Sequence, residues 1–98
     1  DGLLGSYGVE AILTDADIRA ALTAVLLCAN DPVAAWGGAE ILRKQHGVEP
    51  ALVTGPATDN AVGVEQIEAR LGLTAINALS NAVELGDHVA RAIWGAEL

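Results

Sequence analysis

The stretch that decides the fold is ALVTGPATDNAVGVEQIEARLG, residues 51–72. Its apolar beginning, within residues 50–54, predicts a short strand. A loop of small polar residues follows. The charged segment 60–71 then predicts an amphipathic helix that turns Val64, Ile67 and Leu71 inward and is closed by a glycine. This order raises the question of whether the loop TGPATDN binds a ligand at the end of a strand or only caps the helix.

The same pattern continues toward the C-terminus. Residues 73–79, LTAINAL, predict a second strand. Ser80 or Asn81 then caps a final helix that ends before Gly95, with an inner face of Leu85, Val89 and either Ala92 or Ile93. The order strand, helix, strand, helix from residue 48 onward predicts parallel strands joined by right-handed crossovers.

Toward the N-terminus, Asp31 and Pro32 predict the start of a helix that runs to about His46 and ends at Gly47. For residues 14–29 we favour one long helix capped by Thr14 or Asp15, because alanine and leucine dominate and no glycine or proline interrupts the run. The competing interpretation is a short helix over 15–22 followed by a buried strand over 23–28. Residues 9–13 predict a further short strand, and residues 1–8 form a glycine-rich leader.

Together these elements predict an α/β fold, with a small parallel sheet of three or four strands flanked by helices, Rossmann-like or flavodoxin-like in arrangement. The 98 residues fit a single domain, 1–98. Because the chain opens with Asp1 rather than methionine, we expect this domain to be a fragment or subunit of a larger assembly.

The composition restricts the partners. Charged residues make up 18% of the chain, against about 25% in an average soluble domain. We therefore expect part of the surface to be covered by self-association or by a second protein subunit. The net charge of −8 disfavours nucleic acid. No apolar run approaches the roughly 20 residues that cross a bilayer, so we expect no membrane partner. One cysteine and no visible secretion signal predict a cytoplasmic protein.

Ligands of parallel sheets bind beyond the carboxyl ends of the strands, where helix N-termini present free amides. Here those ends are rich in small polar residues. A glycine there lets a ligand approach the backbone, threonine hydroxyls donate hydrogen bonds, and an aspartate binds a cation or a sugar hydroxyl. The same residue types are ordinary helix caps, which is the simpler account of them. The predicted ligand-binding residues are Thr54, Gly55, Thr58, Asp59, Asn60, Asn77 and Ser80.

Several chemical signatures are missing from the sequence. It has neither a P-loop nor the dinucleotide-binding glycine pattern. Every lysine and arginine falls in a predicted helix, so an anionic ligand would depend on backbone amides or a metal. The spacing of histidine and cysteine predicts no metal site. The cofactor is unknown from the sequence.

Three hypotheses of function follow. The first is a ligand-binding subunit or domain of a larger oligomeric α/β assembly. The alternative is a non-catalytic structural or protein-interaction subunit, which pairs through a small-residue face, Ala34, Ala35, Gly37, Gly38 and Ala39, with Trp36 as an anchor. The third is a small enzyme with Cys28 as nucleophile, although a buried structural cysteine is the simpler reading of Cys28. Whether the protein is an enzyme is left open.

Overall fold

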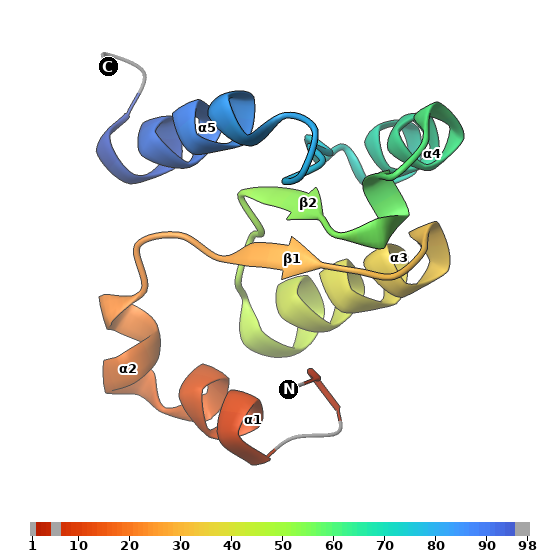
Figure 1. The fold of residues 1–98 in the computed structure, drawn as a ribbon. Helices are drawn as coiled ribbons and strands as arrows, with labels where there is room; N and C mark the ends of the chain where they lie inside the picture. The colour runs from red at the N-terminus through yellow and green to blue at the C-terminus, as the bar shows by residue number, and fades with distance from the viewer. Residues whose placement is uncertain (1, 5–6, 96–98) are drawn as a thin grey trace.

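The protein is described by a computed structural model that covers residues 2–4 and 7–95 (Figure 1). Residues 1, 5 and 6 of the predicted leader lie outside the described part. The elements in chain order are α1 (Tyr7–Thr14), α2 (Ala16–Ala21), β1 (Leu26–Cys28), α3 (Pro32–Glu40) with a π turn (Ile41–Gln45), β2 (Leu52–Thr54), a 3₁₀ turn (Pro56–Thr58), α4 (Ala61–Leu71) and α5 (Ala82–Trp94). None of the helices in this described part is long and apolar enough to cross a lipid bilayer.

The prediction of three or four strands is wrong. In the described residues the sheet has two parallel strands, β1 and β2, with Leu27 opposite Val53. The segment predicted as a strand over 73–79 contributes only one bridge, between Ala75 and Val53. The segment turns away because Asn77 Oδ1 accepts hydrogen bonds from the amides of Leu79 and Ser80 at 3.0 Å each. The fold is therefore a small mixed α/β arrangement.

Two predictions near the N-terminus are also wrong. Residues 9–13 belong to helix α1 and not to a strand. The long helix over 14–29 is broken into α2 and β1, so the competing order of a short helix and then a strand is confirmed. The strand is not buried as that interpretation expected, because Leu26 and Cys28 are exposed. Asp15 caps α2, since its Oδ1 accepts from the amides of Asp17 at 2.9 Å and Ile18 at 3.0 Å. The chain leaves the helix at Leu22, which is extended (ψ 127°).

The helix starts predicted at Pro32 and near Asn60 are confirmed. Asp31 Oδ1 accepts from the amide of Ala34 at 2.8 Å, and Asn60 Oδ1 accepts from the amide of Gly63 at 2.8 Å. Each bond satisfies an amide that the helix cannot pair internally. Helix α4 ends at Gly72, whose left-handed backbone (φ 65°) suits glycine.

One face of the sheet packs against α3 and α4. Leu27 and Val53 lie on this face and share a buried cluster with Ala35, Ala39 and Ile67. Helix α3 comes close because Gly38 has no side chain: a Cβ there would lie 2.8 Å from Leu27 Cδ1. The small-residue face predicted as a surface is thus mainly internal packing, and Ala35 and Ala39 are completely buried.

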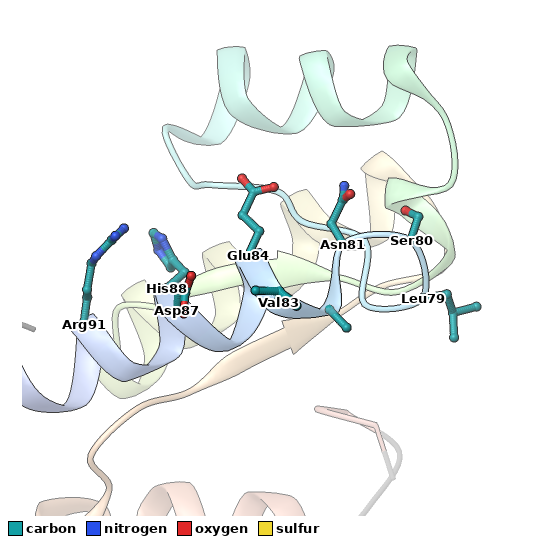
Figure 2. Close-up of a pocket in the computed structure, with 9 residues that line it drawn as sticks. Leu79, Ser80, Asn81, Val83, Glu84, Asp87, His88 and Arg91 are labelled. Carbon is teal, nitrogen blue, oxygen red and sulfur yellow. The ribbon is translucent and has the colours of Figure 1, made fainter.

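The opposite face is covered more thinly. Leu52 and Ile76 are buried but do not belong to the main cluster. Helix α5 crosses in front of β2 (Figure 2), and its His88 Nε2 contacts the carbonyl of Ala51 at 3.2 Å. The predicted inner face of α5 is only partly inward, because Leu85 and Val89 are half-buried whereas Ala92 and Ile93 are exposed.

Candidate functional site

Five of the seven predicted ligand-binding residues line one open cavity of about 410 Å³. They come from two loops: the one before α4 contributes Thr58, Asp59 and Asn60, and the turn before α5 contributes Asn77 and Ser80. The two loops lie together because β2 and the Ala75 segment are paired side by side. The cavity therefore sits at the carboxyl end of the small sheet.

Asn77 holds these two loops together. Its Nδ2 donates to Thr58 Oγ1 at 3.2 Å and to Asp59 Oδ1 at 2.9 Å. Its Oδ1 accepts from the Ser80 hydroxyl at 3.1 Å as well as from the two backbone amides of its own turn. Thr58 Oγ1 in turn donates to the Gly55 carbonyl at 2.7 Å. These bonds preorganise the rim before any ligand arrives.

The other two predicted residues are not part of the cavity lining. Gly55 faces β1, where a Cβ would lie 2.7 Å from Cys28 Sγ and 2.8 Å from the Ala29 carbonyl oxygen. Thr54 lies opposite Cys28 in the register, and among the described residues its buried Oγ1 has no hydrogen-bond partner. Both residues therefore belong to the sheet side of the loop.

Different residues of the loop TGPATDN cap the helix and present polar groups at the cavity. Asn60 is the cap of α4, as the simpler reading of the loop proposed. Asp59 does not cap α4: its backbone ends the 3₁₀ turn, its side chain is exposed, and Asn77 holds one of its carboxylate oxygens at the cavity. The loop also packs tightly onto α4. A Cβ at Gly63 would lie 2.1 Å from the Ala57 carbonyl oxygen, which is too close for any side chain to fit. The loop both starts the helix and presents polar groups.

Glu68, Asn81 and Glu84 also line the cavity, although none of them was predicted to bind a ligand. Glu68 lies two turns into α4, where Oε2 accepts from the Ala75 amide at 3.3 Å. Glu84 lies in the first turn of α5. Helix periodicity could have found Glu68, because Asn60, Val64 and Glu68 recur at four-residue spacing on one face.

The charge of the cavity is negative. Three carboxylates, Asp59, Glu68 and Glu84, line it together with amides and hydroxyls, and its lining contains no lysine or arginine. Anionic ligands are disfavoured by this arrangement, whereas cations and hydroxyl-bearing molecules match its hydrogen-bond acceptors. Among the described residues, no group of three or more histidine, cysteine, aspartate or glutamate side chains is placed to hold a metal ion.

A second hollow, of about 680 Å³, continues from this cavity along α5 and shares Ser80, Asn81 and Glu84 with it. Figure 2 shows Glu84, His88 and Arg91 projecting from the same side of the helix. His88 is held by the Ala51 carbonyl oxygen, which can only accept, so Nε2 carries the proton. The cavity and this hollow therefore meet at the first turn of α5 and together form one groove.

Cys28 lies apart from this groove. It is exposed rather than buried, so the reading of Cys28 as buried structural packing is wrong. Its exposure follows from its position on β1, where alternate side chains face the thinly covered side of the sheet. Neither histidine of the chain is among the residues that line the hollow beside Cys28.

Comparison of the chain with protein-family models, with curated proteins and with solved structures finds no match. Any assignment of function therefore depends on the geometry and chemistry of the chain itself. Fold alone is a weak guide in such a case, because one architecture serves many functions.

Proposed function

We propose that the protein is a ligand-binding domain or subunit that takes a small polar molecule at the carboxyl end of its sheet. The observation that carries the proposal is the convergence of Thr58, Asp59, Asn60, Asn77 and Ser80 on one cavity from two separate loops. A cavity of about 410 Å³ falls within the size range of small-molecule sites, which is about 300–1,000 Å³.

The chemistry of the lining narrows the class of ligand. Carboxylates and amide oxygens accept hydrogen bonds, so they favour a molecule with several hydroxyl groups or an amine. The lack of a basic residue in the lining disfavours phosphates and carboxylates. We therefore place sugar-like polyols and small amines ahead of nucleotides and organic acids.

The test is ligand-observed NMR with a defined set of monosaccharides, polyols and diamines, alongside sugar phosphates of matched size. We expect binding from the neutral or cationic set, weakened at least tenfold by Asp59→Asn or Glu84→Gln. The matched control is Glu65→Gln, since Glu65 is exposed on α4 and does not line the cavity. Equal binding by the three variants, or a preference for the phosphates, would sink the proposal.

A second candidate is a protein-interaction subunit, favoured by an apolar hollow of about 240 Å³ between α3 and α4. Val33 is 78% exposed and Trp36 is 51% exposed beside it. Such an exposed aromatic next to an apolar hollow is typical of an interface anchor. Trp36→Glu should then halve the native mass measured by light scattering, whereas Glu65→Gln should leave it unchanged. A native protein that is already monomeric at micromolar concentration would end this candidate.

The third hypothesis, Cys28 as a catalytic nucleophile, stays a prediction without further support. An exposed thiol reacts as any free cysteine does. A catalytic thiol must be activated by a base or a positive field beside it. Labelling by iodoacetamide at neutral pH should be compared between the native and the urea-unfolded protein. A native rate no faster than the unfolded rate would rule the hypothesis out.

A further inference from the structure

The outer edge of β1, the side that does not face β2, is a surface separate from the proposed ligand cavity. Among the described residues, β1 is paired with a strand on one side only. The amide and the carbonyl of Val53 both hydrogen-bond to the segment around Ala75. The main-chain groups of its neighbours in β2, Leu52 and Thr54, therefore point toward β1. By the same alternation Leu27 faces β2, which leaves the main-chain groups of Leu26 and Cys28 on the far edge.

A groove of about 400 Å³ runs along this edge. It is lined by five consecutive residues, 24–28, together with Leu3, Ile12, Leu13 and Leu42 from other parts of the chain. Successive side chains of a strand point to opposite faces, so a hollow that touches five in a row lies along the edge and not on one face. The groove and the free main-chain groups are therefore one surface.

The edge strand is short, but it carries none of the charged or proline residues by which proteins often prevent unwanted strand pairing. Residues 23–29 contain no charge, proline or glycine, and Leu26 is 41% exposed. An apolar edge of this kind is a ready template for another strand. A lipid or hydrocarbon would fill the groove but would leave the main-chain donors and acceptors unpaired, whereas an extended peptide satisfies both.

The segment of the chain that supplies most of the groove lining is acidic, which indicates which kind of peptide fits. Between Tyr7 and Asp31 the chain carries Glu10, Asp15, Asp17 and Asp31 against one basic residue, Arg19. A second copy of this chain, with a net charge of −8 of its own, would be repelled. A strand with an apolar centre and basic flanks is complementary.

We propose that the β1 edge binds a partner protein by strand addition, in which an extended apolar segment with basic flanks pairs with Leu26 and Cys28 and fills the groove against α1. This surface is separate from the cavity at the carboxyl end of the sheet. It can hold or fail independently of the ligand-binding proposal.

The test uses the full chain and a fluorescein-labelled peptide of sequence KKVLVTVK, measured by fluorescence anisotropy at low salt. We expect saturable binding, with shifts of the Leu26 and Cys28 amides in NMR spectra. Methylation of alternate main-chain nitrogens of the peptide should weaken binding at least tenfold, as should Leu26→Lys. The charge-matched control Val62→Lys, at an exposed apolar side chain of α4 that lines none of the hollows described above, should stay within twofold of the native protein.

Three results would overturn the proposal. Equal binding of the methylated peptide would show an apolar hollow without strand pairing, and this arm needs no variant protein to fold. Failure of the native chain to bind the peptide would remove the edge as a docking surface. A native dimer that Leu26→Lys splits into monomers would assign the edge to a second copy.

Discussion

The two faces of the sheet are covered by helices in different ways. On one face α3 and α4 share a continuous buried cluster with Leu27 and Val53. On the other face Leu52 and Ile76 are buried outside that cluster, and α5 contributes no fully buried residue. The same strands therefore separate a densely packed side from a thinly packed side.

This difference indicates which part of so small a protein is rigid and which part opens more easily. Buried apolar contacts determine how rarely a segment opens. The α3–α4 side supplies the rigid part, whereas α5, which borders the candidate cavity, depends on half-buried residues such as Leu85 and Val89. Local opening of α5 should therefore precede global unfolding.

The largest expected effect is Ile67→Ala on the densely packed side. Ile67 is 1% exposed in the main cluster, and truncation of such a side chain costs about 3 kcal/mol of unfolding free energy. The matched variant Leu85→Ala on α5 should cost about 1 kcal/mol, because this side chain is only half-buried. Urea denaturation measures both. Equal losses would contradict the contrast between the two faces.

The next effect compares two glycines within helices. A Cβ at Gly63 in α4 would lie 2.1 Å from the Ala57 carbonyl oxygen, so Gly63→Ala should destabilise the protein by about 2 kcal/mol. A Cβ at Gly86 in α5 meets nothing within 4 Å, so Gly86→Ala should stabilise it by about 1 kcal/mol through helix propensity. Thermal melts should move in opposite directions. Destabilisation by Gly86→Ala would mean that α5 is packed more closely than described.

The smallest effect concerns the ion pair of Arg43 with Glu49 beside the end of α3. The Arg43 guanidinium also donates to the Leu71 carbonyl at 3.1 Å, which ties this pair to α4. Its hydrogen bonds to Glu49 hold the pKa of that carboxyl below its ordinary value. Because Glu49 is 64% exposed, Glu49→Gln should cost only about 0.5 kcal/mol near neutral pH.

The pH dependence gives the sign of this contribution. A lowered pKa in the folded state stabilises the protein above the unfolded pKa of about 4.3, and the contribution disappears as the pH falls through the lower folded pKa. The stability difference between the native protein and Glu49→Gln should therefore shrink from pH 6 to pH 3. A difference that stays constant with pH would contradict the ion pair.

Local signals in the sequence predicted the helix starts well. Asp31 with Pro32, Asn60, and Asp15 each satisfy free amides of the turn that follows them, an interaction that spans only three residues. Strand assignment did worse, because residues 9–13 read equally well as a helix with Val9 and Leu13 on one side. The segment 73–79 does not form a full strand, because the Asn77 side chain accepts hydrogen bonds from the amides of Leu79 and Ser80 and closes a turn.

The candidate cavity shows the same division. The polar residues at the strand ends were visible in the sequence, and five of the seven meet at one cavity. Gly55 and Thr54 turned instead toward β1, and Glu68 and Glu84 joined the lining from helices. Which side of a loop faces solvent depends on the neighbouring strand, so loop composition alone did not reveal it.

By itself the sequence determined the caps of α2, α3 and α4, the acidic charge and the polar residues of the two loops, because these depend on neighbours a few residues away or on composition alone. The cap predicted for the final helix is not among them, since the Asn81 side chain makes no capping hydrogen bond. Only the tertiary structure decided that the helix within residues 14–29 ends after α2. The strand that follows, β1, is stabilised by hydrogen bonds to β2, and the paired residues Leu26 and Leu52 are 26 positions apart in the sequence. In the part of the chain that the structure describes, it likewise decided that the sheet has two strands and that β1 pairs on one side only. Strand pairing is a contact between distant segments. A single strand is not stable by itself, so its local sequence gives only a weak signal of where it will pair.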